Sequence, residues 1–378
     1  MASFELVQTL LEAEDSRLWH VAWSRDGKTL ATCGSNRVCT LFRQNSSSLT
    51  FTKVAQLEDS HSRTIRACEF SPVLENGREL LATASFDATC VIWEKKTSAD
   101  QVGEERWEAV ATLDGHENEV KSISWSFDGL YLATCGRDKT CWVWELSQDD
   151  DENGGDDRMP NEDDDGDDDG GQNEEWRCVS VLTGHDGDVK MVRFHPNRYM
   201  FASCSYDNTV RLWDYSDAEG DFVSVAVLQG HDNTVWGCDF LTPDLLVSCS
   251  QDLTIRTWAR RVQTESEEDF NEGEERWDQL FTIESAHTRT IFALDVLRES
   301  NLLITAGGDN DVIVRKVNPE NGFVNEVDAV KCRNAHEQDV NCVRFRPRTD
   351  KEQDQTRIMF ATAGDDGKLK LWTMSGMV

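Results

Sequence analysis

Gly115-His116-Glu117-Asn118-Glu119-Val120 opens the stretch of sequence that decides the fold. The stretch continues through Leu132-Ala133-Thr134-Cys135-Gly136-Arg137-Asp138 and ends in Trp142-Val143-Trp144-Glu145. It contains a histidine, a threonine, an aspartate and a tryptophan, at His116, Thr134, Asp138 and Trp144. The same kinds of residue return at His185, Ser203, Asp207 and Trp213. A set that returns at similar spacing indicates a repeated structural unit.

The repeat runs along nearly the whole chain. Its most regular position, which we call the anchor, is filled by Asn36, Asp87, Asp138, Asp207, Asp252, Asp309 and Asp366. A serine or threonine stands four positions before every anchor, and a tryptophan stands six positions after it, except for Phe42 in the first unit and Arg315 in the sixth. The last six anchors are preceded by a histidine: His61, His116, His185, His231, His287 and His336. The chain therefore contains seven units.

Each unit is predicted to form four short strands separated by turn residues. In the third unit we expect strands at 120–125, 130–135, 141–145 and 176–182. Four strands per unit, with this residue signature, are typical of WD40 propeller blades. We predict an all-β fold: one domain over residues 1–378, forming a seven-bladed WD40 β-propeller. Residues 4–10 precede the first unit, and we expect them to be the outer strand of the last blade, which closes the ring.

The recurring polar residues predict a buried hydrogen-bond network in each blade. The hydroxyl would link the histidine to the tryptophan indole, and the aspartate would orient the imidazole. A catalytic triad or a metal site is disfavoured, because such a site occurs once whereas these residues recur with the blade period. The first unit lacks the histidine and the sixth has Arg315 in place of tryptophan, so we expect weaker networks in these two blades.

The net charge of −33 is unevenly distributed. Residues 149–175 contain 15 acidic residues and one basic residue, Arg158, with few apolar side chains. We predict that they form a disordered acidic loop between strands of blade 3, and that residues 261–276 form a second acidic loop in blade 5. Such a charge repels phosphate backbones and disfavours direct nucleic-acid binding.

No apolar run is long enough to span a membrane, and no secretory signal opens the chain. We therefore expect no membrane association and a cytoplasmic protein, with the nucleus as an additional compartment. The 12 cysteines contain no Cys-x-x-Cys pair, and most of them follow the blade period. They are predicted to be small core residues and not ligands, so no cofactor is expected.

Several strings of the sequence closely resemble the cytosolic iron–sulfur protein assembly WD40 family. They are 84–89, 115–122, 132–139 and 338–343. The resemblance implies a non-enzymatic scaffold in the late, targeting step of cytosolic iron–sulfur cluster assembly. It also implies two partners, a small MIP18-type protein and a HEAT-repeat scaffold, with which clusters are delivered to cytosolic and nuclear apoproteins. The two acidic loops depart from the family pattern, so no family function is carried over to them.

Two positions in each unit are expected to be exposed on the face opposite the acidic loops: the residue before the anchor, and the second residue of the inner strand. In this acidic chain they include four bases and five aromatics: Arg66, Lys121, Arg137 and Lys190, with Trp19, Phe86, Tyr206, Trp236 and Phe292. Arginine and aromatic residues are typical of interaction hot spots. We predict that the bases attract carboxylates of a partner and that Trp19, Trp236 and Phe292 receive an apolar or aromatic residue. The family resemblance implies a suitable partner, an acidic client tail that ends in an aromatic residue. It also makes Arg137 the leading residue, because the string 136–139 matches the family.

Other readings of this sequence remain open. The same residues would also be found on the rim of a propeller whose bases are solvated and bind no partner. A substrate receptor of a ubiquitin ligase, or another generic WD40 adaptor, is the alternative function; the receptor motif Trp-Asp-x-Arg is incomplete here, because Trp213-Asp214 is followed by Tyr215-Ser216. A methyl-lysine reader would need acidic neighbours around its aromatic cage, whereas these positions are basic. An enzyme is disfavoured by the lack of a recognisable nucleophile, phosphate loop or metal-ligand spacing.

Overall fold

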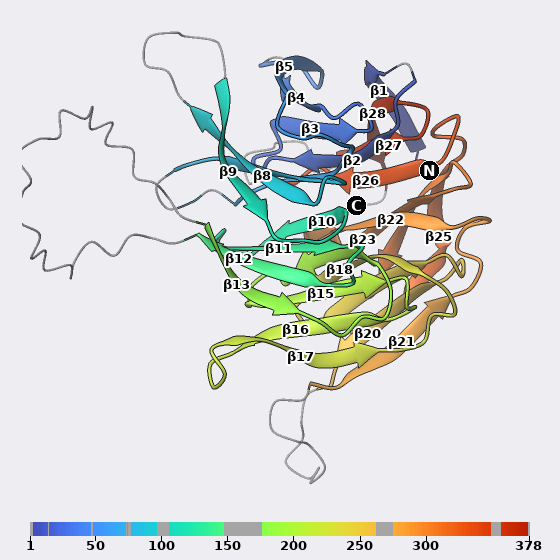
Figure 1. Cartoon of the computed structure of the whole chain (residues 1–378). Coiled ribbons are helices and arrows are strands. Elements are labelled where there is room, and N and C mark those ends of the chain that lie inside the picture. The colour runs from blue at the N-terminus through green and yellow to red at the C-terminus, as the bar shows by residue number, and fades with distance from the viewer. Residues whose placement is uncertain are drawn as a thin grey trace, which may run out of the picture.

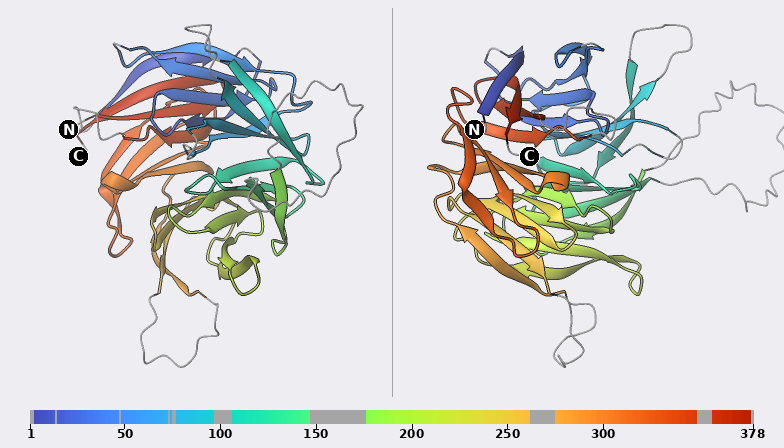
Figure 2. Two further views of the ribbon diagram at one scale, coloured as in Figure 1. Left: turned by 90° about the vertical axis from the view of Figure 1, so that its left-hand side faces the viewer. Right: turned by 180° about the vertical axis from the view of Figure 1, so that it is seen from behind.

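The computed structural model describes residues 3–13, 15–46, 48–72, 74, 77–96, 106–146, 176–261, 275–348 and 357–376. In these residues, seven four-stranded antiparallel sheets are arranged around a common centre (Figures 1 and 2). The prediction of an all-β, seven-bladed propeller is therefore confirmed. The predicted acidic loop at 149–175 lies outside the described residues, as does 262–274 of the second loop.

The strands follow the chain order, from the inner to the outer strand of each blade. Blade 1 consists of β2 (Leu18–Trp23), β3 (Thr29–Gly34), β4 (Cys39–Gln44) and β5 (Phe51–Leu57). Blade 2 consists of β6 (Ile65–Phe70), β7 (Leu80–Ser85), β8 (Thr89–Lys96) and β9 (Arg106–Asp114). Blade 3 consists of β10 (Val120–Trp125), β11 (Tyr131–Gly136), β12 (Cys141–Leu146) and β13 (Trp176–Leu182). Blades 4 and 5 consist of β14 (Val189–Phe194), β15 (Met200–Ser205), β16 (Val210–Ser216) and β17 (Asp221–Leu228); and β18 (Val235–Thr242), β19 (Leu245–Ser250), β20 (Ile255–Arg260) and β21 (Trp277–Ile283).

Blade 6 consists of β22 (Ile291–Leu297), β23 (Leu302–Gly307), β24 (Val312–Val317) and β25 (Val324–Cys332), with a short 3-10 turn, η1 (Arg298–Ser300), after β22. Blade 7 consists of β26 (Val340–Phe345), β27 (Arg357–Gly364), β28 (Lys368–Ser375) and the first strand of the chain, β1 (Ser3–Glu12).

The ring is closed as predicted. β1 pairs antiparallel with β28, with Leu6 opposite Trp372, so the two ends of the chain share one sheet. Phe4 of β1 also packs edge-on against Phe360 of β27, with ring centroids 5.6 Å apart. The inner strand of each blade contacts those of both neighbouring blades, including β26 with β2. Pairing the first strand with the last removes two free sheet edges.

The core lies between adjacent blades. The second strand is buried along its whole length in blades 1, 2, 4, 5 and 6, and in all but its first residue in blades 3 and 7, because the neighbouring blades cover both faces of the sheet. Ten of the 12 cysteines are buried in these layers, as predicted, whereas Cys178 is exposed and Cys332 is half-buried.

The predicted hydrogen-bond network is present in blades 3 and 4. In blade 3, the His116 imidazole lies 2.6 Å from Asp138 and 2.8 Å from the Thr134 hydroxyl, and the Trp144 indole N–H donates to that hydroxyl at 3.0 Å. In blade 4, the same distances are 2.7, 2.8 and 2.8 Å for His185, Asp207, Ser203 and Trp213. Equivalent contacts occur in blades 2, 5 and 7. These residues therefore form a repeated hydrogen-bond network in the core of the blades.

The two irregular blades differ from each other. In blade 1, the Thr32 hydroxyl donates to the backbone carbonyl of His20, so the histidine-to-tryptophan chain is missing. In blade 6, by contrast, the fully buried Arg315 guanidinium donates to the Thr305 hydroxyl at 3.1 Å, in the place of the indole. It also donates to the Ala286 carbonyl at 2.7 Å. The network of blade 6 is therefore complete. The prediction that it would be weaker is wrong, because it did not take into account the N–H donors of this arginine.

Candidate partner-binding face

One face of the ring carries the anchor turns, and we call it the anchor face. The loop after each periodic histidine meets the anchor here: for example, the Glu117 backbone N–H donates to Asp138 at 3.1 Å. In all seven blades, the residue before the anchor donates its backbone N–H to the residue before the inner strand, as Arg137 does to Glu119 at 2.9 Å. The residue after the anchor of blade 3, Lys139, has a left-handed conformation (φ 71°) that tightens the turn. The turn and the start of the inner strand therefore lie side by side.

The second residues of the inner strands converge on the central channel. Six of them line one narrow cavity of about 30 Å³: Arg66, Lys121, Lys190, Trp236, Phe292 and Asn341. The seventh, Trp19, lies next to them, under the Arg66 guanidinium. We call these seven residues the channel mouth. The sequence predicted them to be exposed, which is wrong: Asn341 is buried and the others are half-buried, because the inner strands crowd together at the ring axis.

Aromatic rings support the cations of the channel mouth. The Arg66 guanidinium lies 5.1 Å from the ring of Trp19, and the Lys190 ammonium lies about equally far from Tyr206 and Trp236, at 5.1 and 5.0 Å. Trp236 in turn packs edge-on against Phe292 at 5.1 Å. The faces of aromatic rings attract cations. Four of the five predicted aromatic residues are therefore brought together with two of the predicted bases.

Polar groups at the channel mouth are left without partners in the described part of the chain. The buried indole nitrogens of Trp19 and Trp236 have no hydrogen-bond acceptor there. Arg66 has no carboxylate within 4.0 Å among the described residues, and its guanidinium contacts the Trp19 carbonyl at 3.4 Å. Buried donors without acceptors favour the binding of a group that can accept hydrogen bonds.

The channel mouth carries more positive than negative charge. Asp188 forms ion pairs with both Lys121 and Lys190, the latter at 3.5 Å, so that one carboxylate serves two ammonium groups. Desolvation, together with the nearby Lys121 ammonium, lowers the pKa of Lys190 to about 8. Desolvation also lowers the pKa of Arg66. An incoming carboxylate would relieve the repulsion between these cations.

Arg137 and Phe86 lie further from the axis. The Arg137 side chain is 58% exposed and lies 3.2 Å from the Glu119 carboxylate. Phe86 is half-buried, and its carbonyl accepts a hydrogen bond from Arg63 at 2.7 Å. Arg63 is itself 57% exposed and lies 3.4 Å from Glu119. Arg63 is not among the residues predicted from the sequence, although its place two residues after the periodic His61 identifies it.

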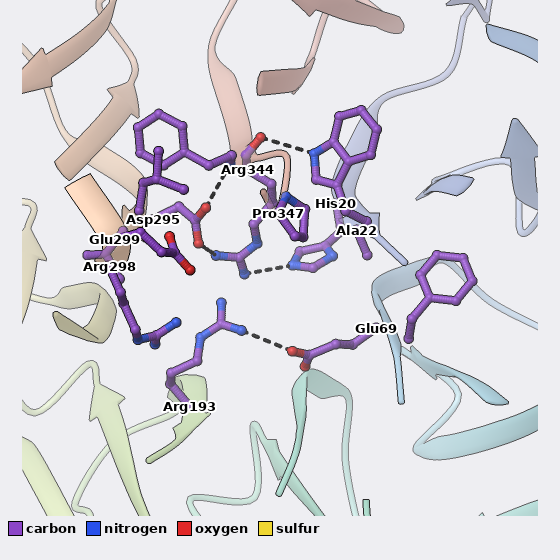
Figure 3. A pocket seen from close by; sticks show the side chains of 14 residues that line it. His20, Ala22, Glu69, Arg193, Asp295, Arg298, Glu299, Arg344 and Pro347 are labelled. Carbon is purple, nitrogen blue, oxygen red and sulfur yellow. Dashed lines mark hydrogen bonds and ion pairs between the residues drawn. The ribbon is translucent and has the colours of Figure 1, made fainter. Parts of the chain in front are cut away.

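A second cavity of about 230 Å³ lies towards the other ends of the inner strands, where Trp23, Phe70 and Phe345 line it, and His20 and Arg344 line both cavities. Its bases face carboxylates (Figure 3): Arg193 lies 3.0 Å from Glu69, and Arg344 lies 3.1 Å from Asp295. Desolvation and the Arg344 guanidinium lower the pKa of His20 well below its usual value, and the neutral imidazole lies 3.3 Å from Arg344. None of these charged residues was predicted from the sequence to belong to a site. Because the charges around this second cavity are largely compensated, the channel mouth is the better candidate for binding.

Two further findings concern the described residues alone. They contain no group of three or more histidine, cysteine, aspartate or glutamate side chains that could hold a metal ion. None of their helices is long and apolar enough to cross a membrane.

Comparisons with known proteins agree with the fold. A family model described as WD domain, G-beta repeat matches residues 4–43, 107–145, 176–214, 222–259 and 328–373. The chain is also similar to proteins named probable cytosolic iron-sulfur protein assembly protein 1. The protein from Chaetomium globosum is 30% identical, with 94% of this chain and 93% of the relative covered. The one from Scheffersomyces stipitis is 30% identical over 96% and 98%, and the one from Vanderwaltozyma polyspora is 35% identical over 84% and 83%. The chain belongs to the WD40-repeat family and, within it, to the cytosolic iron–sulfur protein assembly proteins.

Proposed function

We propose that this protein is a non-enzymatic adaptor in cytosolic iron–sulfur protein assembly, and that it binds its partners through the anchor face. The names of its relatives support the process. The observation that carries the binding role is the composition of the channel mouth. In a chain of net charge −33, two ammonium groups there share one carboxylate, and the third cation, Arg66, has no carboxylate within 4.0 Å among the described residues. These cations lie beside aromatic rings and beside two indole N–H groups that have no acceptor in the described part of the chain. Such a surface suits an acidic partner with an apolar or aromatic residue.

In the finer form of the proposal, the adaptor acts in the late, targeting step. It joins a small MIP18-type protein and a HEAT-repeat scaffold, and it helps to deliver clusters to cytosolic and nuclear apoproteins. The clients would contribute tails with carboxylates for Arg66, Lys121, Arg137 and Lys190, and an aromatic residue for Trp19, Trp236 and Phe292. The cytoplasm, and additionally the nucleus, would be the place of this function. The family resemblance supports the pathway, and the charge and the aromatic rings of the anchor face support the kind of client.

Charge reversal at Arg137 tests the proposal. Arg137→Glu would place a second carboxylate beside Glu119 and repel an acidic client tail, so its affinity should fall about tenfold or more, as measured by fluorescence anisotropy with a labelled client peptide. The matched control is Arg177→Glu. Arg177 is 66% exposed and also pairs with a glutamate, Glu145. This pair lies at the end of β12 that is remote from the anchor turn. Unchanged affinity in a folded Arg137→Glu variant would contradict the role of Arg137.

Affinity purification of the intact protein from cytosol tests the choice of partners. Recovery of a MIP18-type protein together with a HEAT-repeat scaffold is the expected result. Recovery of a cullin adaptor in their place would favour the ubiquitin-ligase receptor instead. In the structure, Asp214 of the incomplete receptor motif is held by Arg198 at 2.5 Å, in an ion pair within the blade.

A further inference from the structure

The residue that precedes the inner strand has the same role in two successive blades. In blade 4 this residue is Asp188, which pairs with Lys121 of the preceding blade and Lys190 of its own. In blade 3 it is Glu119, which pairs with Arg63 of the preceding blade and Arg137 of its own. In each case one carboxylate holds two cations that come from neighbouring blades. The two clusters therefore have the same arrangement, and in each of them two positive charges surround one negative charge.

Blades 6 and 7 provide an internal comparison. Arg289 stands two residues after the periodic histidine, as Arg63 does, and it lies 3.8 Å from Asp339, which takes the place of Glu119. The residue before the anchor, however, is Asp365 and not an arginine. Asp365 accepts a hydrogen bond from Asn341 at 2.7 Å and lies 3.6 Å from Arg17. The carboxylate at the equivalent position, Asp339, is therefore paired with one guanidinium, and the cluster has no excess positive charge because Asp339 and Asp365 balance Arg289 and Arg17.

The geometry around Glu119 leaves both guanidinium groups accessible. The Glu119 side chain is only 13% exposed, whereas those of Arg63 and Arg137 are 57% and 58% exposed. Desolvation opposes the ionisation of Glu119, but the pKa of this carboxyl is nevertheless lowered, in part by the charges of Arg137 and Arg63. An ionised carboxylate thus forms an ion pair with each of the two arginines. Arg63 also donates to the Phe86 carbonyl at 2.7 Å, but both arginine side chains are more than half exposed and retain N–H groups that are not used in these contacts. Guanidinium N–H groups can bind a further carboxylate through two hydrogen bonds.

We propose that Arg63 and Arg137, held together by Glu119, form an arginine clamp that binds a carboxylate of an acidic protein segment whose other end occupies the channel mouth. This inference rests on the proposed function and extends it. The described bases of the clamp and the channel mouth all come from blades 2 to 4, whereas Trp236 and Phe292 come from blades 5 and 6. The segment therefore lies across the ring axis, with its acidic part over blades 2 and 3 and its apolar part towards blades 5 and 6. A nucleic acid does not fit, because the chain as a whole is strongly acidic.

Two labelled peptides test the clamp with the full-length protein. One has several aspartates and glutamates before a terminal tryptophan; in the other, asparagine and glutamine replace the acidic residues. Arg63→Gln should weaken binding of the acidic peptide about tenfold and leave the neutral peptide unaffected. Arg137→Gln should do the same, and the double variant should be little weaker than either single variant, because both arginines bind one carboxylate. Arg63→Lys should restore only part of the affinity, because an ammonium group lacks the fork.

Arg289→Gln is the matched control, and it should bind both peptides as the unaltered protein does. Lys190→Gln, in the channel mouth, separates the two proposals. If Lys190→Gln weakens binding of the acidic peptide while Arg63→Gln and Arg137→Gln bind it normally and melt at the normal temperature, the clamp is overturned and the proposed function stands. If none of the three variants weakens binding, the anchor face does not bind acidic segments, and that result overturns the proposed function and the clamp with it.

Discussion

Asp366, the anchor of blade 7, links the stability of the fold to pH. Its side chain is 3% exposed, lies 2.8 Å from His336 and accepts the backbone N–H of Glu337 at 3.1 Å. Desolvation opposes ionisation, but these hydrogen bonds lower the pKa of Asp366 from 3.8 to about 2. Since the pKa is lower in the folded protein, the ionised carboxylate stabilises the fold above about pH 4, and this contribution is lost as the pH falls through about 2.

Asp366→Asn should therefore lower the free energy of unfolding by about 2 kcal/mol at neutral pH, and by less in acid. Urea unfolding at a series of pH values measures this difference. Asp217→Asn is the control, because Asp217 is exposed in the turn between β16 and β17. An equal loss of stability at neutral and at acidic pH would mean that Asp366 acts through packing alone and not through its charge.

Arg315 shows what a sequence pattern can and cannot predict about one residue. The spacing correctly assigned position 315 to the tryptophan position of blade 6, but the absence of tryptophan suggested a weak network. The structure shows that a guanidinium can replace the indole, since one N–H reaches Thr305 and another reaches the Ala286 carbonyl. The pattern identifies the position and the role, whereas the number of donors that reach their acceptors depends on the packing around the side chain.

At the scale of elements, the closing strand offers a direct test. β1 covers the edge of β28, and its Phe4, Val7, Leu10 and Leu11 pack against the core layers beside blade 7. Deletion of residues 3–12 would leave β28 as an unpaired edge and uncover apolar side chains, so the chain should melt at a clearly lower temperature and aggregate. A synthetic peptide with the β1 sequence, added in excess, should bind and restore part of the melting temperature, as measured by differential scanning fluorimetry.

A scrambled peptide of the same composition is the control for this experiment and should have no effect. A deletion variant that melts at the normal temperature would contradict the role of β1 in closing the ring.

The limits of the strands could be predicted more accurately than the exposure of their residues. The first and fourth strands of blade 3 have the predicted bounds, because turn residues flank them, and the second strand is displaced by only one residue. Trp19 and Lys121, by contrast, were expected to be exposed. Their burial arises when seven inner strands meet around one channel, which the alternation of residues within a single strand does not reveal. For the same reason, the charged layer of Glu69, Arg193 and Arg344 went unrecognised.

At the scale of the whole molecule, the charge can be separated into parts with different roles. Residues 149–175 contribute −14 of the net −33, which leaves −19 for the rest of the chain. The strands on either side of this segment are joined in one hairpin, in which Leu146 pairs with Trp176. This end of β12 and β13 is remote from the anchor turn, which precedes Cys141 at the other end of β12. At physiological salt, charges more than about 8 Å apart are largely screened from each other.

We therefore propose that residues 149–175 are not required for partner binding. Replacement of residues 149–175 by a short Gly-Ser linker should change the melting temperature little, since closing a shorter loop has a small effect on stability. At physiological salt, the variant should bind the acidic labelled peptide as tightly as the intact protein. At low salt it should bind this peptide faster, because less negative charge repels the peptide at long range. Stopped-flow anisotropy at two ionic strengths measures both effects, with the neutral peptide as control. Loss of binding at physiological salt would show that the segment takes part in partner capture.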